Sequence, residues 1–530
     1  MSILKELVKK SEITGLAILL TGCSSLDPHG ENGEMILPAA DFQSVVPGIC
    51  QRSKSADGRP ALIFPGKNDV EAVIGTVSKL PGKYLRIEAE IETAKAKPGT
   101  FDVYRVRLDQ PGKIPQEHLV LPVLSPVKKQ RSVLLEPFFE ADPALPAKLR
   151  IERNNSDPRT SCREAAALLS VRIQPMQKPE DNITVQALAG YNSWPFIHAV
   201  GGKLVCVYSR GSAHSCDEPT RGVYAKTSED GGKTWGGETL ISNAPGGGEV
   251  TIGKGSDSRG AMLVWVRYIG IGKNWHHDLY HTEDGIRFRR IARLRPDPMP
   301  MQITDVFAVP GVGLMSLWFA GTYRNKPENS WGTLVSADDG KTWRQTVVES
   351  GLFLGEWPTE PSAVYLGNGR ILAIARTESW GKNTLRAQFQ LESADSGKTW
   401  KRTRTNITDV QASTPSLILD KGRLFLYYYQ RGAGLLKCRT ADPEQIWNHP
   451  LQWSDPEIAA LGSKDGFHAG NVNAAVWKNR HCVAFYSGNE RNTSVVVKIL
   501  SVNSPVFTGK KQADRSIVNI KKGNDHDPIH

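Results

Sequence analysis

Apolar and polar residues alternate one by one in two stretches of the first third of the chain. Residues 85–92 read LRIEAEIE, and residues 169–174 read LSVRIQ. A period of two puts every second side chain on the same face, which is typical of strands with one buried face. We therefore expect residues from about 34 to 178 to form a β-sandwich that is large enough to enclose its own core. This sandwich either binds carbohydrate or serves as a structural packing domain.

A second pattern recurs six times after residue 190: an apolar run, a short turn that contains Gly or Asn, and another apolar run. Two β-rich runs around such a turn are a hairpin signal. Six hairpins predict six small sheets. The hairpins are expected over residues 196–209, 250–267, 303–320, 363–376, 417–431 and 472–487.

Four segments share a box in which Ser or Thr, one residue and Asp are followed by Gly and an aromatic residue. The boxes begin 54, 54 and 57 positions apart, which is about the length of a four-stranded blade. The spacing therefore favours an all-β fold in which a six-bladed β-propeller follows the sandwich. The Asp of each box can accept hydrogen bonds from a tight turn, so we interpret these residues as structural. The boxes cover residues 228–235, 282–288, 336–343 and 393–400, and their aspartates are Asp230, Asp284, Asp338 and Asp395.

The N-terminal segment resembles the leader of a bacterial lipoprotein. Three lysines precede a short apolar run over residues 13–20, and the run ends in Leu20-Thr21-Gly22-Cys23. The run is too short to span a membrane. We expect cleavage before Cys23 and lipidation of its thiol, which would anchor the protein to a bacterial outer membrane on the periplasmic or cell-surface side. The predicted regions are a signal peptide (1–22), the sandwich (23–182), the propeller (183–508) and a flexible tail (509–530).

The cysteine count agrees with export. A lipidated Cys23 leaves six cysteines, an even number that permits three disulfides in an oxidising compartment. The pairs expected are Cys50 with Cys162, Cys206 with Cys216, and Cys438 with Cys482. The sequence contains no zinc-type cluster of cysteines and histidines, so we expect no metal and no cofactor.

The chain is basic, with a formal net charge of +11. Such a charge attracts polyanions at long range. No nucleic-acid-binding motif accompanies it, which argues against nucleic acid as the partner.

The predicted hairpins carry a repeated cation. At the end of the second strand, four of the six hairpins have an arginine, and a planar guanidinium suits a carboxylate because it can donate two parallel hydrogen bonds. Repetition at one structural position favours a shared anionic ligand. The four residues are Arg210, Arg267, Arg376 and Arg431.

One acidic residue stands at the start of a predicted hairpin. Glu360 precedes Pro361 and lies 16 residues before Arg376. One hairpin can therefore place a carboxylate and a guanidinium in the same central cleft. A carboxylate there can act as a general base or can stabilise an oxocarbenium-like transition state.

Residues 186–505, with their repeated boxes, resemble the sialidases, which are propellers with Asp-box repeats. In this family three arginines hold the sugar carboxylate, an Asp is the acid/base, and a Tyr–Glu pair supplies the nucleophile. The resemblance implies that Arg376 and Arg431 are the second and third arginines and that Glu360 is the glutamate. Ser193 stands where the first arginine is expected, and residues 467–471 before the last hairpin contain no tyrosine.

The same losses resemble the endosialidases of bacteriophage tailspikes, which cut polysialic acid. These enzymes keep two arginines and the glutamate and use a histidine in the first-blade loop, a position that His214 matches. Asp217 is the competing candidate, because exo-type enzymes use an Asp from this loop. Weaker candidates for the rim of the site are Tyr191, Arg210, Arg267 and Trp275.

The resemblance implies a glycoside hydrolase that cuts α-ketosidic bonds of sialic acid or a related nonulosonic acid, with endo action on an acidic polysaccharide. Two alternatives stay open. One is an exo-acting hydrolase for sialic acid, Kdo or another nonulosonic acid, and the other is a non-catalytic glycan-binding lipoprotein. The sequence predicts neither the sugar nor the oligomeric state.

Overall fold

The computed structural model describes residues 33–501, apart from residues 56–57, 95–99, 121–122, 125–129, 136–137, 158–159, 161, 163, 271–273, 323–327, 379–386 and 411–412. The described residues form an all-β molecule with 38 strands, one short 3-10 helix and one short α-helix. Within that part of the chain, no helix is long and apolar enough to cross a membrane. The predicted leader, Cys23 and the predicted tail lie outside the described residues.

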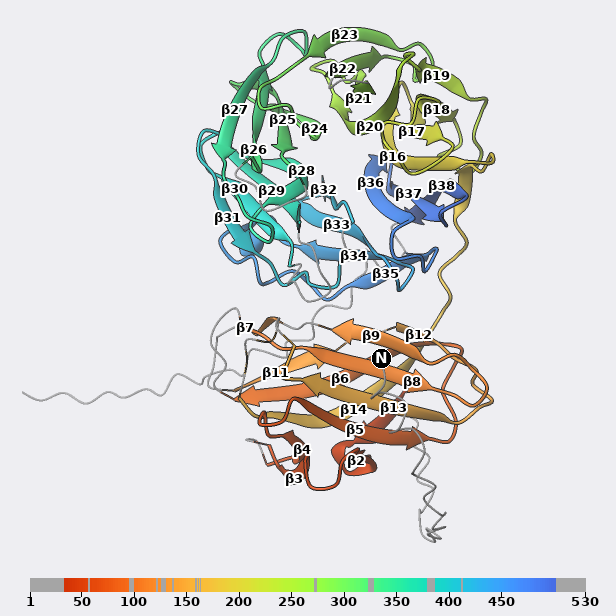
Figure 1. Ribbon diagram of the computed structural model, residues 1–530, viewed down its shortest axis with the longest axis vertical. Helices are drawn as coiled ribbons and strands as arrows, with labels where there is room; N and C mark the ends of the chain where they lie inside the picture. Colours follow the sequence, from red (N-terminus) through yellow and green to blue (C-terminus); the bar gives the residue numbers. More distant parts are fainter. Residues whose placement is uncertain are drawn as a thin grey trace, which may run out of the picture.

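Two antiparallel sheets form the N-terminal part (Figure 1). One sandwich sheet contains, in spatial order, β11 (Gln130–Leu135), β6 (Tyr84–Ala94), β14 (Ala166–Met176), β4 (Pro60–Phe64) and β3 (Gln51–Lys54), with β1 (Met35–Pro38) on β14 and β12 (Phe138–Glu140) on β6. The other sandwich sheet contains β2 (Phe42–Ser44), β5 (Val70–Val77), β13 (Ala147–Asn154), β8 (Tyr104–Asp109) and β9 (Gln116–Val120). The short strands β7 (Thr100–Phe101) and β10 (Val123–Leu124) pair with each other, and the 3-10 helix η1 (Ala39–Asp41) follows β1.

A single apolar core lies between these two sheets, and the period-two pattern explains it. On β6, Leu85, Ile87 and Ile91 are fully buried, whereas the charged residues between them are not. The alternation predicted for this strand is therefore confirmed. Burying a large aliphatic side chain contributes about 1.5–3 kcal/mol, so such a core can hold the two sheets together.

Six groups of four strands follow, and they are called the first to the last sheet in chain order. Single parallel pairs also join the first to the last of them and the second to the third. The first three are β16 (Tyr191–Val200), β17 (Lys203–Gly211), β18 (Gly222–Ser228) and β19 (Thr239–Ser242); β20 (Gly247–Ser256), β21 (Met262–Gly270), β22 (Trp275–Thr282) and β23 (Arg289–Leu294); and β24 (Gln302–Val309), β25 (Gly313–Ala320), β26 (Ser330–Ser336) and β27 (Arg344–Glu349). The next two are β28 (Pro358–Gly367), β29 (Arg370–Thr377), β30 (Phe389–Ser393) and β31 (Lys401–Arg404); and β32 (Ser416–Asp420), β33 (Arg423–Gln430), β34 (Leu435–Ala441) and β35 (Glu457–Leu461), with α1 (Pro443–Ile446) before β35. The last is β36 (Ala469–Trp477), β37 (Arg480–Gly488) and β38 (Thr493–Ser501), completed by β15 (Ile183–Gln186).

The first strand of each group lies on the inside of the arrangement seen in Figure 1. These inner strands contact one another in succession, and β36 of the last group also contacts β16 of the first. All six predicted hairpins are present as antiparallel pairs of the first and second strands and are confirmed. Hydrogen bonds that involve side chains join the starts of each neighbouring pair of inner strands, so the start of every inner strand lies at the same end of this arrangement.

The Asp boxes form tight turns between the third and fourth strands. In the third box, Asp338 Oδ1 accepts hydrogen bonds from Ser336 Oγ at 2.8 Å and from the backbone N–H of Thr342 at 2.8 Å. The indole of Trp343 donates to the carbonyl of Gly340 at 2.9 Å beneath the turn. The other three boxes repeat these contacts to their Asp. The structural interpretation of the four aspartates is therefore confirmed.

The predicted disulfides are wrong, because the six described cysteines are free thiols. Cys206 packs in the core between the first and last sheets, whereas Cys216 packs against the core of the second and third sheets. Cys438 lies in the core between the fifth and last sheets, and Cys482 faces the opposite side of the last sheet. An even number of cysteines does not reveal that the members of these two predicted pairs belong to different cores.

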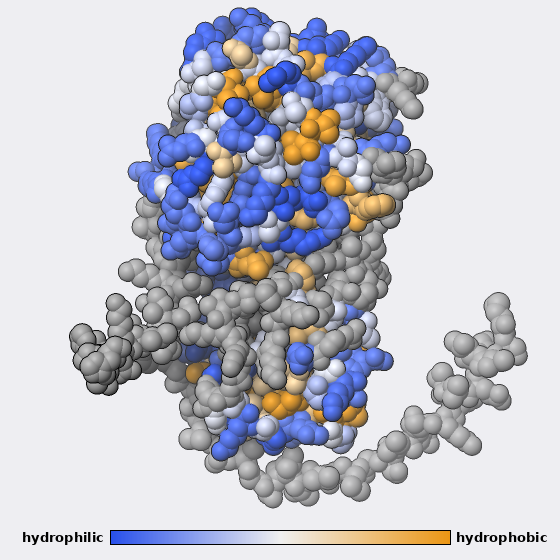
Figure 2. All heavy atoms as spheres, turned by 90° about the vertical axis from the view of Figure 1, so that its left-hand side faces the viewer, coloured by the Kyte–Doolittle hydropathy of each residue, from blue (hydrophilic) through white to orange (hydrophobic). Residues whose placement is uncertain are grey.

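The two parts of the molecule touch through polar contacts. Arg86 Nη1 of the sandwich lies 3.4 Å from Glu457 Oε1, and Asn182 Nδ2 donates to the carbonyl of Leu461 at 2.7 Å. Figure 2 shows one side of the molecule, on which hydrophilic residues cover most of the coloured surface and apolar residues form small separate patches. Patches of that size are ordinary for a surface in water.

Candidate active site

Three residues on the inner strands have a backbone conformation that non-glycine residues rarely adopt. Trp194, Glu360 and Asn471 have φ values of 50°, 49° and 47°. Each lies near the start of its inner strand, where the register with the second strand shifts. Such a bulge re-aims a side chain, and a left-handed residue costs about 1–3 kcal/mol and persists only where its surroundings enforce it. The sheets therefore hold these three residues at the same end of the inner strands.

Glu360 is held by two neighbouring sheets. Its side chain is buried, and Oε2 accepts a hydrogen bond from Arg376 Nη1 at 3.2 Å and one from Thr414 Oγ1 at 2.6 Å. Arg376 belongs to the same hairpin, as predicted, whereas Thr414 precedes β32 of the next sheet. The carboxylate is thus fixed at the junction of the fourth and fifth sheets.

Arg376 contacts a second carboxylate. Its Nη2 lies 2.6 Å from Glu378 Oε2, while Nη1 faces Glu360. Both glutamate side chains are buried. Two acids on one guanidinium keep its planar face in a fixed orientation, because both branches of the fork are engaged.

Arg431 reaches the same end of the molecule from the fifth sheet and is buried. Nε donates to the carbonyl of Ala469 at 2.6 Å, and Nη2 donates to Asn471 Oδ1 at 3.1 Å and to the hydroxyl of Tyr486 at 3.2 Å. A Cβ at Gly470 would lie only 3.3 Å from Arg431 Nε, so the glycine leaves room for the guanidinium. Residues of the last sheet therefore orient Arg431, which belongs to the fifth sheet.

His214 lies in an aromatic cluster beside these arginines. Its ring centroid lies 5.2 Å from that of Tyr191 and 4.5 Å from that of Phe467, and the Tyr191 hydroxyl lies 2.9 Å from His468 Nδ1. Burial lowers the pKa of His214 to about 4, and the charges of His468 and Arg431 act in the same direction. His214 is therefore neutral near pH 7, and a neutral imidazole can accept a proton or a hydrogen bond.

Tyr486 is a site residue that the sequence prediction missed. Burial raises the pKa of its hydroxyl, Arg431 and a hydrogen bond with Tyr191 oppose that shift, and the charge of Glu360 adds to it. Tyr486 is therefore a protonated hydroxyl within electrostatic range of Glu360. It lies on β37 opposite Gly470, whereas the family resemblance implies a tyrosine in the segment before the hairpin. Gly488 occupies the hairpin position at which four other hairpins carry an arginine. Tyr486 lies two residues before it, on the same face of β37, and this position is a sequence signal for the tyrosine.

Arg221 is the second missed residue. Its side chain is fully buried, and it stands directly before the third strand of the first sheet, whereas the predicted arginines lie at the ends of second strands. The guanidinium lies 4.7 Å above the Trp194 ring, and Nη1 lies 3.4 Å from Ser193 Oγ. Nε donates to the carbonyl of Ser215 at 3.0 Å, and Nη2 donates to the carbonyl of Ala213. A buried arginine thus stands beside Ser193, where the family resemblance leads one to expect an arginine, and anchors the loop that carries His214.

The remaining candidates make other contacts. Arg210 lies over the ring of Tyr224 at 4.3 Å and pairs with Glu238 at 3.4 Å, so it faces the outer strands of its own sheet. Arg267 donates to the carbonyl of Met301 at 2.9 Å and lies 4.8 Å above the ring of Trp275. The structure does not bring the guanidinium groups of these two arginines into hydrogen-bond contact with Glu360 or Arg431.

Asp217 is exposed on the loop that follows β17. Its Oδ1 accepts a hydrogen bond from Ser215 Oγ two residues earlier. The structure therefore brings together Glu360, Arg376, Arg431, Tyr191 and His214, and leaves Asp217 at the rim. Across the described parts of the chain, no group of three or more His, Cys, Asp or Glu residues could hold a metal ion.

Comparison with known proteins places one domain family in this region. The family model described as a BNR repeat-like domain matches residues 318–452, from the third to the fifth sheet. No curated protein matches the chain. Residues 318–452 are therefore similar to a BNR repeat-like domain, in agreement with the box repeats.

Several solved structures are similar to the chain at low sequence identity. A protein of unknown function from Dyadobacter fermentans is 18% identical, with 61% of this chain and 99% of that chain covered and a TM-score of 0.49. A Hadza microbial sialidase is 13% identical, with 81% and 96% covered and a TM-score of 0.47. Trypanosoma rangeli sialidase in complex with sialic acid is 12% identical, with 62% and 58% covered and a TM-score of 0.44.

Proposed function

We propose that residues 183–508 form a six-bladed, sialidase-like β-propeller and that the protein is a glycoside hydrolase. Its substrate is an α-ketosidic linkage of sialic acid or a related nonulosonic acid, cut in endo mode within an acidic polysaccharide. The observation that carries this proposal is the buried Glu360 carboxylate, fixed by Arg376 and Thr414 at the end of the ring where Arg431 is also held.

The charges of the site suit a sugar carboxylate. Arg376 and Arg431 would bind it through charge-assisted hydrogen bonds, which are about twice as strong as neutral ones. In exchange the substrate would replace part of the contact between Arg376 and its two glutamates. A bound anion must compete with Glu360 and Glu378 for Arg376, so its oxygens must lie in positions that match the guanidinium well. This requirement favours a ligand of specific shape over any polyanion.

Glu360 would activate a water molecule or stabilise the positive charge that develops on the sugar ring. His214, which is neutral near pH 7, would accept a proton or orient the substrate. The alternative for proton transfer is Asp217 on the same loop. Arg221 would hold this loop in place through its hydrogen bonds to the carbonyls of Ser215 and Ala213.

One observation favours the exo-acting alternative. The Tyr486 hydroxyl lies 3.2 Å from Arg431 Nη2 and within electrostatic range of Glu360, so a tyrosine and a glutamate can act at one centre. An exo enzyme would release monosaccharide and accept a small aryl glycoside. A non-catalytic glycan-binding protein would bind without turnover.

We also propose that Cys23 carries a lipid that anchors the protein to a bacterial outer membrane. Such an anchor would hold the site close to the polysaccharide of a cell surface. Labelling of cells with a radioactive fatty acid tests this directly, since Cys23→Ser would remove the label.

The test of the function uses two substrates. The protein is incubated with α2,8-linked polysialic acid and, separately, with an aryl sialoside, and anion-exchange chromatography resolves the products. Short oligomers without aryl release support endo action, and free monosaccharide supports exo action. Binding of the polymer without any product would support the glycan-binding alternative.

Glu360→Gln tests the mechanism. We expect it to lower the rate by roughly a hundredfold or more, because a general base contributes about that much. Glu378→Gln is the matched control: it removes the other carboxylate on Arg376 and is expected to keep most of the rate. Hydrolysis that survives Glu360→Gln at the wild-type rate, with both variants folded by melting temperature, would refute the mechanism.

A further inference from the structure

A cavity of about 560 Å³ opens where the first Asp box meets the hairpin turn of the last sheet. Strand β18 begins next to Arg221 and ends at the box, and β36 begins beside Arg431 and ends at Trp477. The cavity therefore lies at the other end of these sheets from Glu360. We call it the turn cavity and define it by Glu229, Asp230, Lys233, Trp477, Lys478, Asn479, Arg480 and Ser501.

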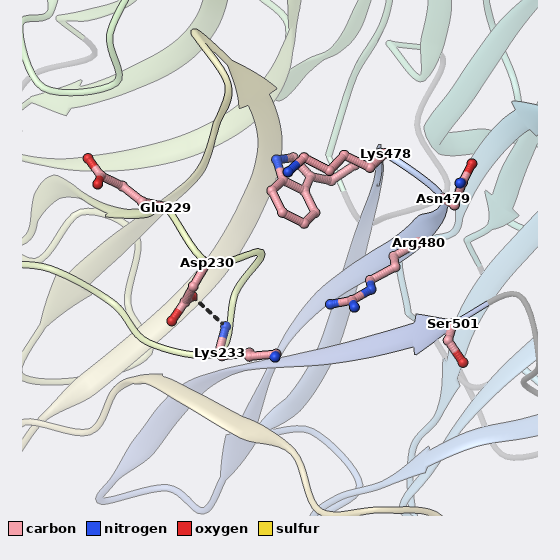
Figure 3. A pocket seen from close by; sticks show the side chains of 8 residues that line it. Glu229, Asp230, Lys233, Lys478, Asn479, Arg480 and Ser501 are labelled. Carbon is pink, nitrogen blue, oxygen red and sulfur yellow. Dashed lines mark hydrogen bonds between the residues drawn. The ribbon is translucent and has the colours of Figure 1, made fainter.

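The turn cavity has three cationic side chains. In the described part of the chain, the structure shows no ion pair for Lys233, Lys478 or Arg480. Figure 3 shows the side chains of Lys233 and Arg480 extending toward each other across the opening. Like charges that approach without an acid between them form a site that favours an anion.

The two acids of the cavity are engaged elsewhere. Glu229 pairs with Lys203 at 2.7 Å. Asp230 accepts hydrogen bonds at both oxygens from its own turn, including one from the backbone N–H of Lys233 that Figure 3 draws. They therefore do not neutralise the three cations directly.

The wall of the cavity is rigid. A Cβ at Gly231 would lie 2.3 Å from the Trp477 ring, so the ring lies directly against the turn of the Asp box. The Lys478 ammonium lies 4.3 Å from the centroid of that ring. Asn479 and Ser501 add an amide and a hydroxyl to the rim, groups that can bond sugar hydroxyls.

We propose that the turn cavity is a second binding site for carboxylated sugar units of an acidic polysaccharide. This inference rests on the proposed function, because it assigns the same class of polymer to a second site. Arg480 and the two lysines would bind the carboxylate, and the amide and hydroxyl groups would bind the ring hydroxyls. A chain held at two distant sites stays bound when one of them releases it, since the second contact becomes intramolecular.

The test compares two double variants that remove the same charge from the same kinds of position. Lys233→Ala/Lys478→Ala removes a box lysine and a hairpin-turn lysine of the turn cavity. Lys398→Ala/Lys421→Ala removes the corresponding lysines from the fourth box and the fifth hairpin, and both of these are exposed. Binding to immobilised α2,8-linked polysialic acid and to polygalacturonate is measured at fixed ionic strength, with dextran as a neutral polymer.

We expect the cavity variant to bind at least one carboxylated polymer about tenfold more weakly, and the control variant to stay within about twofold of wild type. Arg480→Gln is expected to weaken binding in the same direction. Equal losses of binding in the two double variants would mean that the net charge of the protein, and not the turn cavity, attracts the polymer. That result would overturn the proposal. So would unchanged binding in the cavity variant, or a wild-type protein that binds neither polymer.

Hydrolysis of short substrates separates this inference from the proposed function. Both double variants are expected to retain the wild-type rate, because none of the four lysines lies at the Glu360 end. If neither the wild type nor any variant hydrolyses an acidic glycan, the proposed activity is refuted. The binding comparison still tests whether the turn cavity binds the polymer. Melting temperatures of all variants check that each protein is folded.

Discussion

Glu360 occupies its place through a backbone conformation that an ordinary strand would not allow. A φ of 49° in a non-glycine residue persists only where neighbouring contacts enforce it, here the hydrogen bonds from Arg376 and Thr414. Trp194 and Asn471 repeat the conformation on two other inner strands. The site is therefore fixed by the sheets before a ligand arrives, which lowers the ordering cost of binding.

Arg221→Lys tests how the loop that carries His214 is positioned. Lysine keeps the charge but loses the fork that donates to the carbonyls of Ser215 and Ala213. We expect kcat to fall by roughly tenfold to a hundredfold, because small displacements of a reacting group have effects of that size. The rate is measured well below the melting temperature with the substrate that the protein cleaves.

Arg210→Lys is the control for Arg221→Lys. Arg210 also lies over an aromatic ring of the first sheet, but it faces the outer strands. Its replacement should leave kcat within about twofold, as expected for a surface arginine. If Arg221→Lys does the same, Arg221 has no role in positioning the loop.

The candidate site could be predicted only where it follows the repeat. Arg376 and Arg431 stand at the same position at the end of their hairpins, and Glu360 stands at the start of one hairpin, so the repeat marks all three. Arg221 and Tyr486 act through contacts between segments that lie far apart in the sequence, and no periodic pattern marks such contacts.

At the scale of elements, the Asp boxes also join neighbouring sheets. Ser258, in the hairpin turn of the second sheet, donates from Oγ to Asp339 of the third box at 2.5 Å. The first box packs in the same way on Trp477 of the last sheet. Each box therefore stabilises its own turn and can also fasten that turn to the preceding hairpin.

Asp338→Ala removes the carboxylate of the third box. The hydrogen bonds of Thr342 and Ser336 lower the pKa of Asp338 to about 2, so the ionised form is the stabilising one. We expect the melting temperature at pH 7 to fall by about 2–4 °C, with kcat unchanged. The difference from wild type should shrink as the pH falls from about 3.8, the pKa expected in the unfolded chain, through about 2.

Lys341→Ala, in the same turn, is the control for this change, because Lys341 is exposed and takes no part in the hydrogen bonds of Asp338. Calorimetry at pH 7 and pH 3 gives both comparisons. A stability loss that is as large at pH 3 as at pH 7 would show that the ionised carboxylate is not the cause.

The elements that could be predicted are those with a local signal. Alternation marked β6 and β14, and turn residues marked all six hairpins. Strand β15 escaped prediction because it is four residues long and its partner β38 is at the far end of the chain. The disulfide prediction failed for a related reason, since residue counts carry no information on which core holds each thiol.

At the scale of the whole molecule, β15 is the strand between the sandwich and the six later sheets. It pairs antiparallel with β38 and buries Val185 in the core shared by the first and last sheets. The sandwich itself contacts these sheets through polar groups such as Arg86 and Glu457, whose side chains are partly exposed. We expect the β15 connection to be the stronger one, because ion pairs near the surface contribute about 0–1 kcal/mol.

Two shortened chains test this difference. A chain that begins at residue 187 lacks β15, and we expect its unfolding free energy to fall by roughly 3 kcal/mol or more through loss of Val185 and of the strand ladder. A chain that begins at residue 179 keeps β15 and lacks only the sandwich, so it should stay close to the parent in urea denaturation. Equal stability of the two chains would mean that β15 does not hold the last sheet.

The pairing of β15 with β38 also sets an order of events in time. Lys498 donates to the carbonyl of Glu180 across 318 positions of sequence. At a synthesis rate of about 5–20 residues per second, the early strand waits roughly 15–60 s for its partner. During that interval the unpaired backbone edge of β15 can pair with other chains, which is an aggregation hazard that chaperones commonly prevent. Once the late strand has paired, releasing either strand breaks the same sheet, so we expect slow opening of this sheet to limit the lifetime of the folded molecule.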